Sequence, residues 1–119
     1  MNNSDLERLK RIVRTWEAAD AQLKAKGITP ELLMEDDFSQ WALTTPLYNI
    51  GEQVYHLSSE LKAQHPDLPW SMVAGLRHRL VHDYEGINWS VIVEVIFSEM
   101  PGFVEQVKSL CKEIAGDET

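Results

Sequence analysis

The sequence predicts an all-helical protein, folded as an up-and-down bundle of four to five helices. Apolar residues recur at spacings of three and four along nearly the whole chain, which is the pattern of helices with one buried face. The alternating pattern of strands is absent. Glycine, proline and capping residues separate the segments by short connections, which place successive helices antiparallel. The 119 residues are expected to form one domain, residues 1–119.

The first helix is expected between Ser4 and Gly27. Ser4 and Glu7 form the S-x-x-E pattern of a capping box, and Gly27 is a typical C-terminal stop. Apolar residues at helical spacing predict one buried stripe: Leu6, Leu9, Val13, Trp16, Ala19 and Leu23. Thr29 and Pro30 then indicate the start of a short second helix.

A second long helix is expected from near Phe38 onward. Its apolar stripe is Leu47, Ile50, Val54, Leu57 and Leu61. Pro46 lies inside this segment, and one kinked helix is favoured over a new helix capped by Thr45. The dipeptide His65-Pro66 is expected to end it, because the residue before a proline disfavours helix.

Two further helices complete the predicted bundle. One begins at Pro69 and ends near Gly86, and Asn88 is expected to cap the last, which reaches Ile114. Pro101 is expected to bend or restart that last helix. Three tryptophans lie near predicted helix ends: Trp41, Trp70 and Trp89. They are interpreted as closing the ends of the bundle, with an apolar face for a partner as the alternative.

Composition and charge exclude several classes of protein. Eleven basic against nineteen acidic residues give a net charge of −8, which argues against a generally basic nucleic-acid binder. A single cysteine, Cys111, excludes an internal disulfide framework and cysteine-rich zinc modules. No apolar run is long enough to span a membrane, and the N-terminal residues lack the apolar segment of a signal peptide, so a cytoplasmic location is expected. Residues 28–60 hold six acids and no Lys or Arg, whereas residues 61–90 are neutral overall.

The segment 75–88, GLRHRLVHDYEGIN, concentrates groups that can do chemistry. Arg77 is a permanent cation with a fork that fits phosphate oxygens, and His82 can exchange a proton near neutral pH. Together they suit cleavage of a phosphodiester without a metal. The two residues lie about 140° apart on an ideal helix. Either the helix end distorts, or the segments of two subunits meet and form a shared cleft.

Two other interpretations of this segment remain open. In the first, it is a solvated helix face on which Arg79 and Asp83 pair at i,i+4. In the second, His78, His82 and Glu85 share a face and offer the ligand types of a zinc site. Neither interpretation requires catalysis by an Arg–His pair.

The same segment resembles a known family. Arg77, His82 and Tyr84 stand in the R-x4-H-x-Y pattern of the HepT-like ribonuclease toxins of the HEPN superfamily. Further motifs of that family have counterparts along the chain: Ile50-Gly51-Glu52, Pro66 with Leu68-Pro69-Trp70, Gly86-Ile87-Asn88 and Met100-Pro101. The resemblance covers roughly residues 6–114. The chain departs from the pattern at His78, where the family usually has Asn, and at Gln53, where it usually has Ala.

The resemblance implies a HEPN-like homodimer that acts as a metal-independent endoribonuclease with no cofactor. By the resemblance, Arg77 and His82 are catalytic and line a cleft between subunits, with His78 and Asp83 as possible supporting residues. It also implies that the protein is the toxin of a type VII (HEPN/MNT) toxin–antitoxin system. The antitoxin would be an MNT-type nucleotidyltransferase that transfers AMP to Tyr84. RNA is the implied substrate, and neither DNA nor a membrane is an expected partner.

The acidic charge leaves a second hypothesis open. The chain could be a non-catalytic, dimeric partner subunit of a nucleotidyltransferase that binds protein or nucleotide. Intact Arg77, His82 and Tyr84 favour the ribonuclease, whereas a net charge of −8 favours the partner subunit. An RNA-cleavage assay on variants of Arg77 or His82 distinguishes the two.

Overall fold

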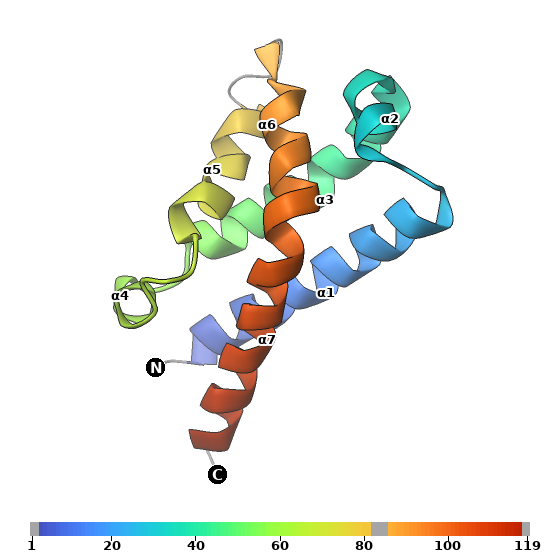
Figure 1. Ribbon diagram of the computed structural model, residues 1–119. Helices are drawn as coiled ribbons and strands as arrows, with labels where there is room; N and C mark the ends of the chain where they lie inside the picture. The colour runs from blue at the N-terminus through green and yellow to red at the C-terminus, as the bar shows by residue number, and fades with distance from the viewer. Residues whose placement is uncertain (1–2, 82–85, 118–119) are drawn as a thin grey trace.

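The computed structural model describes residues 3–81 and 86–117, and all regular structure in these ranges is helical (Figure 1). The elements in chain order are α1 (Asn3–Ala25), α2 (Pro30–Glu35), α3 (Asp37–Tyr55), α4 (Ser59–Gln64), α5 (Trp70–Val81), α6 (Trp89–Glu94), the π-helical segment η2 (Val95–Glu99) and α7 (Met100–Asp117). The predicted all-helical class is confirmed.

One hydrophobic core joins these helices. α3 packs against α5 on one side and α1 on the other, and α1 in turn packs against α7, which crosses it obliquely in Figure 1. The buried stripe of α1 differs from the predicted one at a single position. Ile12 is fully buried, whereas Val13 lies half-buried beside the core. Both residues fit the helical spacing, so the pattern alone could not choose between them.

The first two helices lie close to their predicted bounds. α1 already includes Asn3 and Ser4, so Ser4 lies inside the helix and does not cap it as expected. Gly27 has a φ of 61°, the left-handed conformation that glycine adopts freely after a helix. Thr29 caps α2, because its side-chain oxygen accepts a hydrogen bond from the amide of Leu32 at 3.1 Å.

The second long helix is interrupted where the sequence predicted continuity. α3 runs as one helix through Pro46, as expected, but it ends at Tyr55, and α4 begins at Ser59. The break is fixed by Ser58, which caps α4 through a hydrogen bond from the Leu61 amide. Buried Asp5 of α1 accepts hydrogen bonds from the Ser58 amide at 2.9 Å and hydroxyl at 2.7 Å. This contact joins residues 53 positions apart, which a local pattern cannot reveal.

The last helix continues through its proline. Asn88 caps α6 as predicted, and α6, η2 and α7 follow one another without a gap. In η2, the amide of Met100 donates to the carbonyl of Val95, five residues back. A proline lacks an amide hydrogen and its ring crowds the carbonyl four residues earlier, so a wider π turn before Pro101 relieves that conflict. The helix therefore neither ends nor restarts there.

The three tryptophans have different environments. Trp70 is buried and packs edge-to-face on Phe103, and Trp89 packs partly buried against the core. Trp41 is 67% exposed. The first two close the bundle, as favoured, and the third belongs to an exposed surface. No helix within the described ranges has both the length and the apolarity to cross a membrane.

Candidate functional site

The candidate site is built on the close approach of α3 and α5. A Cβ atom on Gly51 would lie 2.8 Å from the backbone nitrogen of Arg77 and 3.2 Å from the backbone oxygen of Val73. Real Cβ atoms do not approach backbone so closely, so only glycine allows this separation of the two helices. The next residue after Gly51 is Glu52, and the contact therefore sets Glu52 beside Arg77.

Glu52 holds the guanidinium of Arg77. The Nε of Arg77 donates a hydrogen bond to Oε1 of Glu52, and both side chains are partly exposed. The terminal nitrogens of Arg77 make no hydrogen bond with any other side chain in the described part of the chain. An arginine held through Nε still has N–H groups on its terminal nitrogens that face away from the carboxylate, where they can bind an anion.

Two aromatic residues at the end of α3 complete this cluster. The guanidinium carbon of Arg77 lies 4.1 Å from the centre of the Tyr55 ring, a cation–π contact that fixes the plane of the guanidinium. His56 Nε2 lies 3.4 Å from Oε2 of Glu52, and its ring meets Tyr55 edge-on at 5.1 Å. Glu52 thus lies between a permanent cation and an imidazole.

The charges of the cluster support one another. The hydrogen bond from Arg77 lowers the pKa of Glu52 below its ordinary value, and burial opposes that shift. The same bond raises the pKa of Arg77, with smaller contributions from the Glu52 charge and from Tyr55 and Tyr48. Both groups are therefore charged at neutral pH, and Arg77 is a cation at all physiological pH values.

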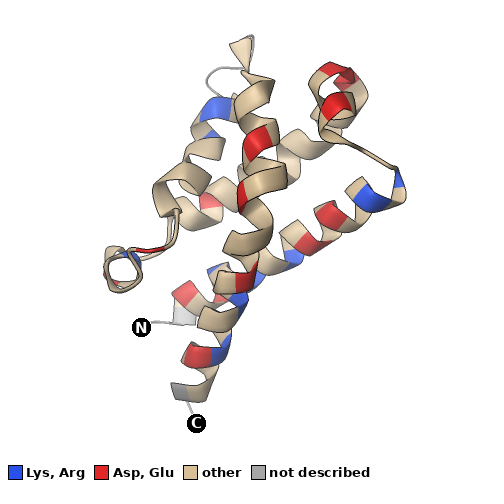
Figure 2. Cartoon of the chain, viewed as in Figure 1, with Lys and Arg blue, Asp and Glu red and all other residues tan. Residues whose placement is uncertain are grey.

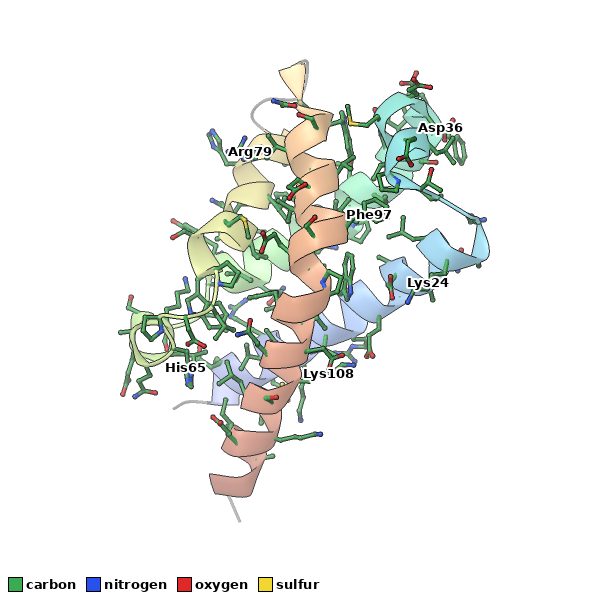
Figure 3. All side chains as sticks on the ribbon, viewed as in Figure 1. Lys24, Asp36, His65, Arg79, Phe97 and Lys108 are labelled. Carbon is green, nitrogen blue, oxygen red and sulfur yellow. The ribbon has the colours of Figure 1, made fainter. Side chains whose placement is uncertain are left out.

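Arg77 lies beside a shallow groove on the exposed face of α5. The groove has a volume of about 360 Å³ and is lined by Tyr55, Lys62, Trp70, Ser71, Ala74, Gly75, Arg77 and His78. Arg79, labelled on the same helix in Figure 3, does not line this groove; it lines another one, toward Glu94 of α6 and Glu99 of η2. Of the predicted site residues, the structure thus brings Arg77 and His78 to one groove.

His82, Asp83 and Tyr84 lie outside the described residues, as does Glu85 of the alternative zinc site. Within the described ranges, no three His, Cys, Asp or Glu side chains are grouped as metal ligands. The zinc interpretation, which needs His82 and Glu85, therefore stays untested, and so does the pairing of Arg79 with Asp83.

Glu52, Tyr55 and His56 are the parts of the cluster that sequence reasoning missed. The sequence motifs contain Glu52 only as part of Ile50-Gly51-Glu52, and they single out neither Tyr55 nor His56. A signal was present, because Glu52 and His56 are four residues apart and share a helix face. The contact with Arg77 spans 25 positions and depends on helix packing, so local spacing could not predict it.

Fold and site together define a class: a small all-helical protein that presents a carboxylate-anchored arginine, able to bind an anionic oxygen, on an exposed helix face. Comparison with known proteins gives the family. The model of the family described as "Ribonuclease HepT-like" matches residues 3–110. The chain belongs to this family, as the motifs around Arg77 indicated.

Named relatives agree with this assignment. A "Putative RNase" of Caldanaerobacter subterraneus subsp. tengcongensis is 36% identical over 90 residues, covering 76% of this chain and 80% of the relative. A "Putative RNase" of Methanocaldococcus jannaschii is 30% identical over 91 residues, covering 76% and 75%. A "Probable ribonuclease HepT" of Thermococcus cleftensis is 28% identical over 98 residues, covering 79% and 89%. No solved structure matches the chain significantly.

Proposed function

We propose that the protein is a metal-independent endoribonuclease that acts as the toxin of a type VII (HEPN/MNT) toxin–antitoxin pair. The observation that carries the proposal is the arginine of the family motif. Arg77 is fixed by Glu52 and Tyr55 and leaves its terminal nitrogens available at an exposed groove. Membership of the ribonuclease HepT-like family makes an RNA phosphodiester the ligand that fits it.

The proposed reaction is a transesterification. The ribose 2′-oxygen loses its proton to a base and attacks phosphorus, and the bond from phosphorus to the 5′-oxygen breaks. A second proton goes to the leaving 5′-oxygen, and a 2′,3′-cyclic phosphate remains. His82 is proposed to move one of these protons, and Arg77 to stabilise the charge that develops on the phosphoryl oxygens. His78, at the same groove as Arg77, and Asp83 are proposed to support them.

An RNA-cleavage assay in EDTA tests the proposal. We expect the protein to cleave RNA and leave 2′,3′-cyclic or 3′-phosphate ends. His82→Ala should lower activity at least about 10²-fold, the scale of a general acid–base group. Arg77→Lys should also lower activity strongly, because lysine lacks the planar fork. The matched controls are His65→Ala and Arg79→Lys. Activity lost on chelation and restored by zinc would instead support the site of His78, His82 and Glu85.

The proposed cleft forms between two copies of the chain. Tyr55 of α3 lines the groove at Arg77, and Met72 and Val81 are further exposed apolar side chains on α5. Small residues at its floor, Ser71, Ala74 and Gly75, would let a second α5 approach closely. Such a dimer would bring two copies of Arg77 and His82 together, which a single helix cannot do for side chains about 140° apart.

The proposed antitoxin is an MNT-type nucleotidyltransferase, and an exposed aromatic surface suits its docking. Phe38 and Trp41, 76% and 67% exposed, lie beside each other at the start of α3. Four acids of α2 and the start of α3 directly precede them in the chain, and Figure 2 shows α2 rich in red. Exposed aromatics commonly anchor protein interfaces, and the acids would attract a basic partner. Phe38→Ser with Trp41→Ser should abolish co-purification with the co-expressed nucleotidyltransferase and leave RNA cleavage unchanged.

Tyr84 is the proposed acceptor of AMP. Each AMP would add a phosphodiester and an adenine beside Arg77. The phosphate would pair with the guanidinium, and the adenosine would exclude RNA sterically. Intact mass after co-expression with the nucleotidyltransferase should show adducts in AMP units that vanish in Tyr84→Phe. A fully inhibited complex with unmodified Tyr84 would mean that the partner inhibits by covering the site alone.

The second candidate function is a non-catalytic partner subunit of a nucleotidyltransferase. The net charge of −8 and the acidic aromatic surface at Phe38 and Trp41 favour it. This candidate predicts a stable complex with the nucleotidyltransferase and no RNA cleavage above that of the Arg77→Lys variant. Because both candidate functions predict the complex, the RNA-cleavage assay decides between them.

A further inference from the structure

Basic residues of this acidic protein gather on one helix. Residues 8–14 contain four of the eleven Lys and Arg side chains and no acid: Arg8, Lys10, Arg11 and Arg14. We call these four residues the basic band. Figure 2 shows blue recurring along α1 and again on the lower part of α7, which crosses it. A ribonuclease with a net charge of −8 needs such a local concentration of cations to hold RNA.

Helical geometry makes the basic band continuous. At about 100° per residue, Arg8, Arg11, Arg14 and Lys10 follow one another around α1 at steps of about 60°, 60° and 40°. Lys10, Arg11 and Arg14 lie on the side of the helix opposite its buried stripe, and the partly buried Arg8 lies at the edge of that stripe. Lys10, Arg11 and Arg14 are exposed, and none of the three forms an ion pair with a described residue. Two exposed acids of α1 lie within one turn of these cations: Glu7 before Arg11, and Glu17 after Arg14.

One end of the band lies next to the candidate active site. Arg8 donates a hydrogen bond from a terminal nitrogen to Oε1 of Gln53 at 3.0 Å. Gln53 directly follows Glu52, which holds Arg77. The departure from the usual Ala at position 53 therefore has a structural consequence, because an alanine could not accept this hydrogen bond from α1.

The other end of the band forms the rim of a groove between α1 and α7. The groove has a volume of about 500 Å³, with Val13 and Cys111 at its floor and Lys10, Arg14 and Lys112 at its rim. Lys108 also lines it but is already paired with Glu17 at 3.1 Å and Glu105 at 3.3 Å. Lys112 therefore extends the cationic surface from α1 onto α7.

We propose that the basic band is a binding site for the phosphate backbone of single-stranded RNA, leading from Arg77 around α1 to the groove at Lys112. This proposal rests on the proposed ribonuclease function. Residues three and four apart on a helix are neighbours, so the band presents a row of cations along one path. Arginine suits phosphate oxygens, and contacts of this kind give affinity without sequence preference. The site is separate from the reacting groups, so it acts on substrate binding and not on the chemical step.

The test compares two double variants of equal charge on the same stretch of chain. Arg11→Gln with Arg14→Gln removes the exposed centre of the band, and Lys24→Gln with Lys26→Gln is the control beyond it. A 2′-O-methylated single-stranded RNA serves as a probe that cannot be cleaved by 2′-oxygen attack. Fluorescence anisotropy at several salt concentrations gives Kd and its salt dependence, and cleavage of unmodified RNA gives kcat and KM.

We expect the band variant to bind on the order of tenfold more weakly than the control, with a log Kd–log salt slope smaller by about 1.4 for two lost phosphate contacts. KM should rise and kcat should remain as in wild type. Equal Kd, slope and KM in both variants would overturn the proposal. So would a change in self-association or in binding to an acidic peptide with RNA affinity unaltered, since the band would then be a protein surface.

The two proposals fail in different ways. If wild type binds the probe but cleaves no RNA, and the band variant loses binding, the results support the basic band as an RNA site and contradict the ribonuclease function. If wild type cleaves RNA and the band variant binds and cleaves like the control, the results support the ribonuclease function and contradict RNA binding by the basic band.

Discussion

Glu52 is the residue on which the candidate site most depends, because it fixes the guanidinium of Arg77 by one hydrogen bond and leaves the terminal nitrogens for a ligand. Glu52→Gln keeps the shape of the side chain but removes its charge. We expect kcat/KM for RNA cleavage to fall about tenfold to 10²-fold, the effect of a misplaced positioning group. Glu60→Gln on the exposed surface of α4 is the control. Unchanged activity in Glu52→Gln would show that Arg77 needs no anchor.

The same pair predicts a pH effect on stability. Arg77 lowers the pKa of Glu52 in the folded state, so the pair stabilises the fold above the unfolded pKa of about 4.3. That contribution is lost as pH falls through the lowered folded pKa. Below about pH 4, the Tm difference between wild type and Glu52→Gln should therefore shrink as the pH falls. A Tm difference that grows in this acidic range would contradict the assignment.

For single residues, the sequence predicted Arg77 as a functional residue but not the side chains that contact it. The residue type and the R-x4-H-x-Y spacing identify a cation suited to phosphate. Its partners come from a different helix, so only the packing of α3 on α5 reveals Glu52 and Tyr55. The other motif residues, His82 and Tyr84, lie outside the described residues, and their roles stay predictions.

The packing of α3 against α5 positions the side chains of the candidate site. Gly51→Ala would place a methyl group against the backbone of Arg77 and Val73, and neither backbone can move without separating the helices. We expect a loss of roughly 1–3 kcal/mol in unfolding free energy, the range for overpacking a core. Gly102→Ala on α7 meets open space and should gain up to about 1 kcal/mol from helix propensity. Denaturant unfolding of both variants measures the two effects, and equal stabilities would refute the close approach.

The break between α3 and α4 depends on a second long-range contact. Asp5 is buried and accepts two hydrogen bonds from Ser58, the residue that caps α4. Asp5→Ala would leave the Ser58 amide and hydroxyl without their acceptor and should lower the unfolding free energy by about 1–3 kcal/mol. Asp20→Ala at the partly exposed partner of Lys24 should change the unfolding free energy by less than about 1 kcal/mol. Equal effects of the two substitutions in thermal or denaturant unfolding would contradict the role of Asp5.

Element boundaries were predictable wherever the signal was local. Helices begin at the predicted caps Thr29 and Asn88 and at Pro30, and α1 is followed by Gly27 in the left-handed conformation. The α3–α4 break was missed, because the apolar stripe continues across it to Leu61 and the cause lies in α1. The spacing of apolar residues predicts which side chains are buried. One helix can end and another begin without interrupting that spacing.

At the scale of the whole molecule, the uneven charge separates three surfaces. Acids of residues 31–37 precede exposed Phe38 and Trp41, cations gather in the basic band on α1, and the groove at Arg77 is lined by small residues beside its cations. The sequence predicted the uneven charge but not its arrangement, since that depends on which helices lie side by side. Each surface suits a different contact: a basic partner, an RNA backbone and a second copy of the chain.

The dimer proposal gives a prediction for the whole molecule. In an isologous dimer, a residue near the two-fold axis meets its own copy, so a charge placed there repels itself. Val81 is 47% exposed on α5 beside Arg77, whereas Phe38 is exposed at the far end of α3. Light scattering should show a particle of twice 13.6 kDa for wild type and for Phe38→Glu, and a monomer for Val81→Glu. Because the proposed cleft needs both subunits, Val81→Glu should also lose RNA cleavage while keeping its helical content by circular dichroism. A wild-type monomer that cleaves RNA would show that one chain holds the whole active site, and Arg77 and His82 would then have to converge through a distorted end of α5.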